Sequence, residues 1–163
     1  MVSHLLPGQP APRFTARTQH GETLTLEELA GRPVLVMFYP YAFSRVCTSE
    51  LQAMAARAPE VRDSGAEVLA VSCDAVHTLR AYGAELSSGL PAGEVELPFR
   101  LISDFWPHGE LAQAYGVLNS ATGAPERTSI ILDAQLLVRH VIASPAGQAR
   151  DLEQTLQLLR GLS

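Results

Sequence analysis

Cysteine is scarce in this sequence, and the two cysteines stand far apart. Cys47 and Cys73 are too few for a disulfide framework, and neither belongs to a C-x-x-C pair or to a metal-ligand pattern. The five histidines are also scattered without metal-ligand spacing, so we expect no metal. This cysteine usage favours a reducing, cytoplasmic location.

Lysine and long apolar runs are absent as well, and we expect no targeting segment. All 12 basic residues are arginine, and the net charge of −5 argues against a nucleic-acid partner held through its phosphates. Residues 1–14 lack the basic stretch and apolar run of a signal peptide, and no run is long enough to span a bilayer. We therefore expect no membrane partner. A G-x-G-x-x-G or phosphate loop is also missing, so we expect no nucleotide cofactor.

The remaining pattern predicts an α/β protein. A chain of 163 residues with 47% apolar residues fits one domain, 1–163, around one core. Apolar runs and turn signals predict an N-terminal β-hairpin followed by five strands, at 13–18, 22–26, 33–39, 67–72, 99–102, 128–133 and 136–142. Helical spacing predicts helices that begin at Ser44 and lie at 76–86, 109–115 and 149–159. This order indicates a thioredoxin-like fold, with a central mixed sheet flanked by helices.

Cys47 is placed for thiol chemistry by its local sequence. The thiolate is the nucleophilic form of cysteine, and the pKa of about 8.5 of a free thiol falls in the first turn of a helix. If Ser44 is the N-cap, Cys47 is the third helical residue, near the free N–H groups. Position alone leaves two interpretations open, since a helical cysteine is equally compatible with a buried apolar role. Ser44 as a plain cap and Pro40 as a strand terminator need no function either.

The combination of residues around Cys47 is more specific than each residue alone. Residues 40–47 read P-Y-A-F-S-R-V-C, which has the form P-x-x-x-[T/S]-x-x-C, and Glu50 extends it to C-x-x-E. This resembles the active-site signature of the peroxiredoxins. Further resemblance lies at 71–74 (V-S-C-D), 97–104 (L-P-F-R-L-I-S-D), 115–117 (Y-G-V) and Arg127. Within that family, D-F-W-P-H-G at 104–109 is most similar to the one-cysteine alkyl hydroperoxide reductase E type.

The resemblance implies a thiol-dependent peroxidase and a role for each matching residue. Cys47 would attack the peroxide as a thiolate, and Arg127 would stabilise it and the charge on the leaving oxygen. Ser44, where most relatives have threonine, would donate hydrogen bonds to the peroxide. Pro40 would shield the pocket from water, and Glu50 would orient an arginine. The implied substrates are hydrogen peroxide and organic hydroperoxides, and the implied assembly is a homodimer.

A sulfenic acid at Cys47 would have to be reduced by another group. Cys73 is the only internal candidate, and its position at the end of an apolar strand favours a packed core cysteine. The sequence therefore favours a one-cysteine cycle with an external thiol or redoxin as reductant. Two other functions compete: a thiol–disulfide oxidoreductase, disfavoured because Glu50 stands where a second cysteine would be, and a peroxide sensor or holdase switched by oxidation of Cys47.

Three further residues carry structural predictions. Asp74 is predicted to cap the helix at 76–86. Phe105 and Trp106 are predicted to pack at a loop, with a substrate or dimer surface as the alternative.

Overall fold

We describe residues 4–163 of a computed structural model of the chain. A seven-stranded mixed sheet forms its centre, with the strand order β2-β1-β5-β4-β3-β8-β9. Its strands are β1 (Thr15–Thr18), β2 (Thr23–Thr25), β3 (Val34–Phe38), β4 (Glu67–Ser72), β5 (Arg100–Ser103), β8 (Thr128–Leu132) and β9 (Val138–Ala143). β3, β4 and β5 are parallel, whereas β8 runs antiparallel to β3. The predicted mixed sheet with an N-terminal hairpin is confirmed.

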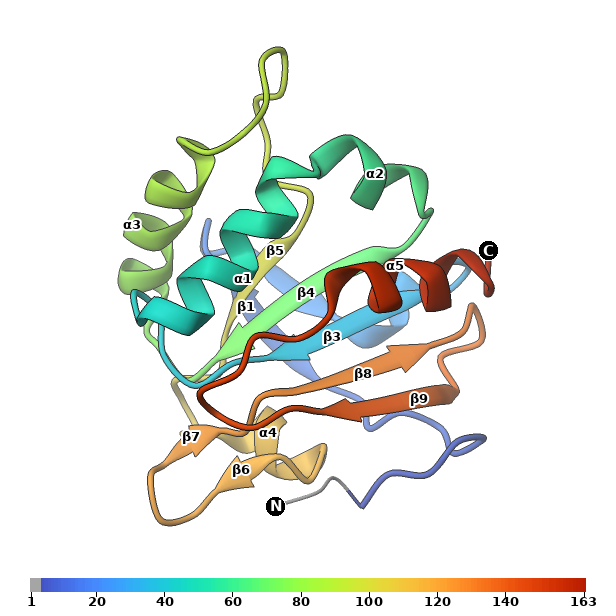
Figure 1. The fold of residues 1–163 in the computed structure, drawn as a ribbon. Coiled ribbons are helices and arrows are strands. Elements are labelled where there is room, and N and C mark those ends of the chain that lie inside the picture. The colour runs from blue at the N-terminus through green and yellow to red at the C-terminus, as the bar shows by residue number, and fades with distance from the viewer. Residues whose placement is uncertain (1–3) are drawn as a thin grey trace.

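Helices cover both faces of the sheet (Figure 1). They are α1 (Arg45–Ala56), α2 (Ala58–Asp63), α3 (Val76–Ser87), α4 (Glu110–Ala114), α5 (Leu152–Arg160) and the 3-10 helix η1 (Leu26–Leu29). Helices α1, α2, α3 and α5 pack on one face, and η1 and α4 pack on the other. None of the helices within residues 4–163 has the length and apolar character needed to traverse a bilayer.

The central strand β3 is buried along its whole length because both of its faces carry apolar side chains. Val34, Val36 and Phe38 belong to the core beneath η1 and α4. Leu35 and Met37 belong to the second core, beneath α1, α3 and α5, which also contains Cys47. Because successive side chains of a strand point to opposite faces of the sheet, the single apolar run of β3 contributes to both cores.

Two features of the fold differ from the sequence predictions. The helical segment predicted to begin at Ser44 is divided at Arg57 into α1 and α2, and Pro59 in the first turn of α2 is compatible with a new helix start. A small second sheet, formed by β6 (Leu118–Asn119) and β7 (Ala124–Pro125), was not predicted. Strands of two residues are too short to produce a recognisable alternation of apolar and polar side chains.

Candidate active site

The loop after β3 leads directly into the helix that carries Cys47. Ser44 is the N-cap residue of α1, with extended backbone angles, and Cys47 is the third helical residue. The Cys47 side chain is fully buried. The sulfur therefore lies where free backbone N–H groups and the helix dipole favour a negative charge.

Arg127, which lies next to the strand β8, contacts the sulfur of Cys47. It immediately precedes β8, whose antiparallel pairing with β3 brings residue 127 beside the loop that leads to α1. Its Nη2 donates a hydrogen bond to Cys47 Sγ across 3.3 Å. Its Nε donates to the carbonyl oxygen of Ala146 at 3.1 Å, and its Nη1 pairs with Glu50. The guanidinium is thus held by two partners, Ala146 and Glu50, and presents its third nitrogen to the sulfur.

Glu50 lies between two buried arginines, and the second one was not predicted. Arg150 makes a bidentate pair with it, from Nε to Oε2 and from Nη2 to Oε1, each at 2.9 Å. The backbone N–H of Arg150 also donates to Oε2 at 2.7 Å. Its Nη1 donates to the carbonyl oxygen of Phe38 at 2.7 Å and to Ser129 Oγ at 3.2 Å. The sequence predicted a helix from residue 149, whereas α5 begins at Leu152 and Arg150 stands in the loop before it.

The charged side chains beside Cys47 are all buried. The side chains of Arg127, Arg150 and Glu50 are 2%, 5% and 3% exposed, so water screens them little. Burial would raise the pKa of Glu50, but the hydrogen bonds and charge of Arg150 outweigh it and lower that pKa. Two arginines and one carboxylate leave one net positive charge in the cluster, and Arg127 presents it to the sulfur of Cys47.

Pro40 and Ser44 flank the loop before α1 and are both half-buried. The hydroxyl of Ser44 donates to the carbonyl oxygen of Tyr41 at 3.0 Å and does not cap the helix. Within residues 4–163 no hydrogen bond joins Ser44 to Cys47. The structure therefore brings Cys47, Arg127 and Glu50 into direct contact, while Ser44 and Pro40 lie in the adjoining loop.

A tyrosine from α3 holds the first turns of α1 in place. The hydroxyl of Tyr82 lies 3.0 Å from Thr48 Oγ1, and its ring centroid lies 4.8 Å from that of Phe43. Burial raises the pKa of Tyr82 to about 12, so the phenol stays neutral at physiological pH. Phe43 has a positive φ of 66°, which is unfavourable for a bulky residue and is maintained by these surroundings.

Cys73 differs in its surroundings from the sequence prediction. It follows β4 and is half-buried rather than packed in either core. Burial raises its pKa to about 12, and the neighbouring carboxylates of Asp104 and Asp74 contribute to the rise. The prediction of a packed core cysteine was therefore wrong, since the strand ends at Ser72 and the next side chain turns into a loop.

Asp74 does not cap α3 as predicted. The N-cap residue is Ala75, and the Asp74 carboxylate instead accepts hydrogen bonds from the backbone N–H of Ala42 at 2.9 Å and from Ser72 Oγ at 2.7 Å. It thereby ties the loop before Cys47 to the end of β4. Oδ2 accepts both hydrogen bonds, so the carboxylate joins the loop to β4 and does not cap the first turn of α3.

Aromatic side chains are exposed at the same edge of the sheet as Cys47. Trp106 is 83% exposed, Phe105 52%, and Tyr41 and Phe43 50% each. They follow the C-terminal ends of β5 and β3, which are on the same edge because β3, β4 and β5 are parallel. The prediction that Phe105 and Trp106 pack at a loop was wrong, because both side chains are largely exposed.

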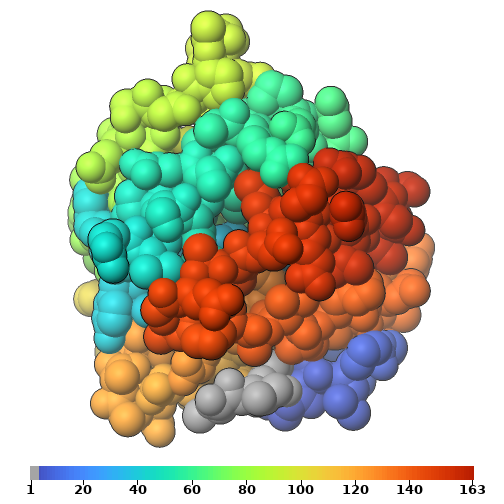
Figure 2. Space-filling model, viewed as in Figure 1, coloured from blue at the N-terminus to red at the C-terminus, as the bar shows by residue number. Residues whose placement is uncertain are grey.

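A small cavity of about 90 Å³ lies behind the charge cluster, between α1, β3 and α5. Met37, Ala53, Met54 and Leu152 contribute its apolar wall, and Glu50 and Arg150 also border it. In Figure 2 a hollow is visible where α1 meets the segment that leads into α5. No three His, Cys, Asp or Glu side chains within residues 4–163 gather as metal ligands would.

Comparison with known proteins identifies the family. The model of the AhpC/TSA family matches residues 7–141. The chain belongs to this family. Among curated relatives, this peroxiredoxin is 34% identical to alkyl hydroperoxide reductase E of Mycobacterium tuberculosis over 145 residues, 88% of this chain and 89% of the relative. It is 31% identical to peroxiredoxin 2 of Thermoplasma acidophilum over 155 residues, 95% of this chain and 75% of the relative.

Solved structures agree with the thioredoxin-like fold. The peroxidoxin BcpB of Mycobacterium tuberculosis superposes with a TM-score of 0.82 at 25% identity, covering 98% of this chain and 99% of that chain. AhpC of Enterococcus faecalis superposes with a TM-score of 0.83 at 24% identity, covering 96% of this chain and 92% of that chain. Peroxiredoxins are thiol-dependent peroxidases, so the predicted family and enzyme class are confirmed.

Proposed function

We propose that this peroxiredoxin reduces hydrogen peroxide and organic hydroperoxides through Cys47 in a one-cysteine cycle. The observation that carries the proposal is the hydrogen bond from Arg127 Nη2 to Cys47 Sγ, 3.3 Å long and fully buried. It pairs the sulfur at the start of α1 with a permanent positive charge. A nucleophile, a helix N-terminus and a fixed cation are the requirements of O–O cleavage by a thiolate.

The first step of the proposed cycle oxidises the sulfur and reduces the peroxide. The Cys47 thiolate attacks the terminal oxygen of the hydroperoxide, so that an S–O bond forms and the O–O bond breaks. The terminal OH becomes part of a sulfenic acid, and the remaining alkoxide, or hydroxide from hydrogen peroxide, takes a proton from water. Negative charge moves from sulfur to the leaving oxygen, and Arg127 lies close enough to stabilise both positions.

The neighbouring residues have supporting roles in this proposal. Glu50 and Arg150 hold Arg127 in one orientation, because the carboxylate fills the space between the two guanidiniums. Pro40 keeps water from the sulfur. Ser44 hydrogen-bonds the peroxide after its hydroxyl leaves the carbonyl oxygen of Tyr41.

An external thiol or redoxin completes the cycle. The external thiol attacks the sulfenic acid and releases water to give a mixed disulfide, and a second thiol releases the Cys47 thiol and a disulfide of the reductant. Cys73 is unsuited to this step because its raised pKa, about 12, leaves it protonated at neutral pH.

The assembly in this proposal is a homodimer of single-domain chains in the cytoplasm. The exposed ring of Trp106, with Phe105 beside it, provides an apolar contact surface at the edge of the site. Sedimentation analysis of the wild type and of Trp106→Ser tests this: a monomeric wild type would contradict the dimer, and a dimer unaffected by Trp106→Ser would contradict this contact surface.

Turnover distinguishes the peroxidase from a peroxide sensor or holdase. Purified protein is mixed with excess hydrogen peroxide or cumene hydroperoxide and a dithiol, and peroxide loss per protein chain is counted. A peroxidase consumes many equivalents, whereas a sensor stops after about one equivalent because its oxidised form is not recycled. Consumption of one equivalent with every thiol and redoxin tried would overturn the proposed function.

A further inference from the structure

The loop between β9 and α5 lies directly on the charge cluster. This 144–150 loop passes the C-terminal end of β3, where Arg150 Nη1 donates to the carbonyl oxygen of Phe38 (Figure 1). In Figure 2 it borders the hollow beside α1. Residues 145–149 are exposed, whereas the Arg127 side chain that the loop contacts is only 2% exposed. The loop therefore separates the cluster from solvent on this side.

Few contacts hold the 144–150 loop in place. Within residues 4–163, two hydrogen bonds join residues 144–149 to the rest of the protein, and both involve Arg127. The backbone N–H of Ser144 donates to the carbonyl oxygen of Arg127 at 2.9 Å, and the carbonyl oxygen of Ala146 accepts from Arg127 Nε at 3.1 Å. At the end of the loop, the backbone N–H of Arg150 donates to Glu50 Oε2 at 2.7 Å. The loop thus depends on polar contacts with the cluster rather than on buried apolar surface.

Arg127 connects this loop to the sulfur of Cys47. Its Nη2 donates to Cys47 Sγ, and its Nε donates to the carbonyl oxygen of Ala146. A thiolate holds the guanidinium through a charge-assisted hydrogen bond, whereas a neutral sulfenic acid holds it less strongly. Loss of the negative charge at Cys47 therefore loosens the guanidinium and weakens its contact with Ala146.

The sulfur of Cys47 has to be uncovered before an external thiol can react with it. The Cys47 side chain is fully buried, and the incoming thiol has to form an S–S bond with its sulfur as water leaves. The first turns of α1 are held by the contact of 3.0 Å between Thr48 Oγ1 and the hydroxyl of Tyr82, and by the burial of Cys47 and Leu51. The 144–150 loop has no comparable burial, so its opening costs less free energy.

We propose that the 144–150 loop is a redox-controlled cover of the peroxidase site. It is closed over Arg127 while Cys47 is a thiolate. Once the sulfur is a neutral sulfenic acid, the loop opens for part of the time and uncovers Arg127 and the sulfur that Arg127 contacts. The inference rests on the proposed one-cysteine cycle, since it requires a thiol from outside the chain. The rate of reduction then scales with the open fraction of the loop.

The first test needs no turnover. Amide hydrogen exchange at Ser144 and Arg150 is compared between the reduced wild type and Cys47→Ser, which has a neutral hydroxyl in place of the thiolate. We expect exchange at both positions to be about tenfold faster in Cys47→Ser, the effect of losing one charge-assisted hydrogen bond. A brief exchange pulse just after oxidation with one equivalent of peroxide should show the same increase. Equal exchange in the three samples would overturn the proposal, even with normal peroxidase turnover.

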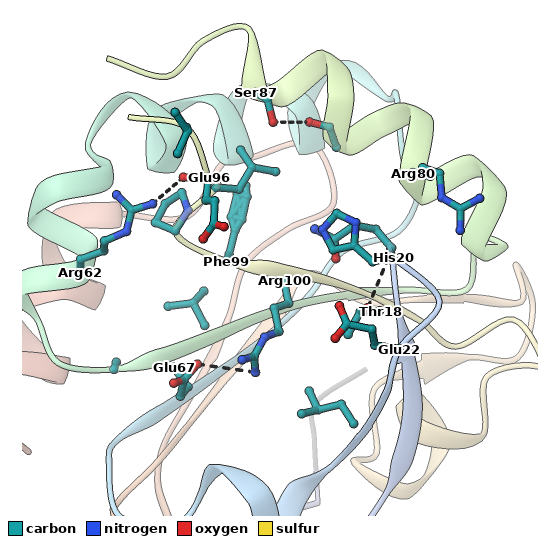
Figure 3. A pocket seen from close by; sticks show the side chains of 18 of the residues that line it. Thr18, His20, Glu22, Arg62, Glu67, Arg80, Ser87, Glu96, Phe99 and Arg100 are labelled. Atoms are coloured by element: carbon teal, nitrogen blue, oxygen red, sulfur yellow. Dashed lines mark hydrogen bonds and ion pairs between the residues drawn. The ribbon is translucent and has the colours of Figure 1, made fainter. Parts of the chain in front are cut away.

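Two amides outside the loop are the controls for this test. In an exposed turn at the opposite edge of the sheet, the backbone N–H of His20 donates to Thr18 Oγ1 across 3.3 Å, beside a groove of about 910 Å³ (Figure 3). In α1, the backbone N–H of Thr48 donates to the carbonyl oxygen of Ser44 at 2.9 Å. Exchange at His20 should be the same in all samples, and exchange at Thr48 should change less than in the loop. A larger increase at Thr48 would show that α1 opens instead of the loop and would overturn the proposal.

Two substitutions change the freedom of the loop in opposite directions. Pro145→Gly increases it, and Gly147→Ala decreases it. Alanine fits at position 147, because a side-chain carbon there meets no atom within 4 Å and the φ of Gly147 lies outside the left-handed region. We expect reduction of the sulfenic acid by a dithiol to be about two- to fivefold faster in Pro145→Gly and slower by a similar factor in Gly147→Ala.

Stopped-flow measurement of the two half-reactions separates this inference from the proposed function. The rate constant with peroxide should be unchanged in both variants, because the loop is closed in the thiolate form. Reduction at the wild-type rate in both variants would overturn the cover. Absence of turnover, with the difference in exchange between the wild type and Cys47→Ser intact, would contradict the one-cysteine cycle and support the coupling of the loop to the sulfur.

Discussion

Arg127 Nη2 lies 3.3 Å from Cys47 Sγ, although 80 positions separate the two residues in the chain. The antiparallel pairing of β3 and β8 produces this contact, because it brings residue 127 beside the loop that continues from β3 to α1. The same guanidinium pairs with Glu50, one turn further along the helix that carries Cys47. The pairing of β3 with β8 and the one-turn spacing of Cys47 and Glu50 on α1 therefore place both residues against the buried guanidinium of Arg127.

Replacing Arg127 should slow the reaction with peroxide more than it changes the fold. A lysine keeps the charge, but its single ammonium cannot contact Cys47, Glu50 and the carbonyl oxygen of Ala146 together. We expect Arg127→Lys to lower the second-order rate constant with hydrogen peroxide by about 100-fold, as loss of an oxyanion-stabilising donor does. Stopped-flow peroxide kinetics measure this, with Arg139→Lys on β9 as the control. A rate within twofold of the wild type would contradict the assigned role of Arg127.

Replacing Arg150 tests whether it acts through Glu50. Arg150→Gln leaves Glu50 paired with Arg127 alone and should destabilise the protein by about 3 kcal/mol, the usual cost of breaking a buried pair. The rate of the reaction with peroxide should fall as well, and the product should still be a sulfenic acid at Cys47. Arg150→Lys restores the charge but not the bidentate geometry and should recover stability only in part. Urea unfolding gives the stability, and a double variant with Glu50→Gln should be less than additive if the two residues are coupled.

Acid should remove the contribution of Glu50 to stability. The hydrogen bonds and charge of Arg150 lower the pKa of the folded carboxyl despite the opposing effect of burial. A carboxyl with a lowered folded pKa stabilises the protein above its unfolded value of about 4.3, and this contribution is lost as the pH falls through the folded pKa. The difference in unfolding free energy between the wild type and Glu50→Gln should therefore be largest at pH 6–7 and shrink below about pH 4. A difference independent of pH from 3 to 7 would contradict the ion pairs.

Cys73 should be a slow nucleophile near neutral pH. Burial raises its pKa to about 12, so at pH 8 only about one thiol in ten thousand is ionised. Alkylation of Cys73 by iodoacetamide in folded Cys47→Ser protein should accelerate about tenfold per pH unit over the range in which the fold persists. Mass spectrometry of quenched samples follows it, with urea-unfolded protein as the control. Rapid alkylation at pH 7 would show that the thiol is more reactive than its surroundings indicate.

The sequence predicted the parts of the site that lie in one local motif. The strand before Pro40, the helix from Ser44 and the third-residue position of Cys47 all follow from apolar spacing and capping preference, and the structure has them. The family resemblance pointed to Arg127, which local periodicity does not mark. Arg150 was missed because its role depends on how a polar loop folds over Glu50, a tertiary contact with no local signature.

Exposure was the property that the sequence predicted least well. The aromatic pair at 105–106 was expected to be packed but is largely exposed, and Cys73 was expected in the core but is half-buried. In both cases a strand ends one or two residues earlier, so the alternation that indicates burial no longer applies. Asp74 was predicted to cap a helix because the local sequence pattern does not show the distant loop whose backbone N–H, at Ala42, donates to its carboxylate.

The most direct test compares wild type, Cys47→Ser and Cys73→Ser. Peroxide consumption is followed with a dithiol or redoxin as reductant, and the protein is oxidised with one equivalent of peroxide and analysed by mass spectrometry with a sulfenic-acid trap. The account predicts that only Cys47→Ser loses turnover and that the trap labels Cys47. Loss of turnover in both variants, together with a Cys47–Cys73 disulfide in the oxidised wild type, would contradict it.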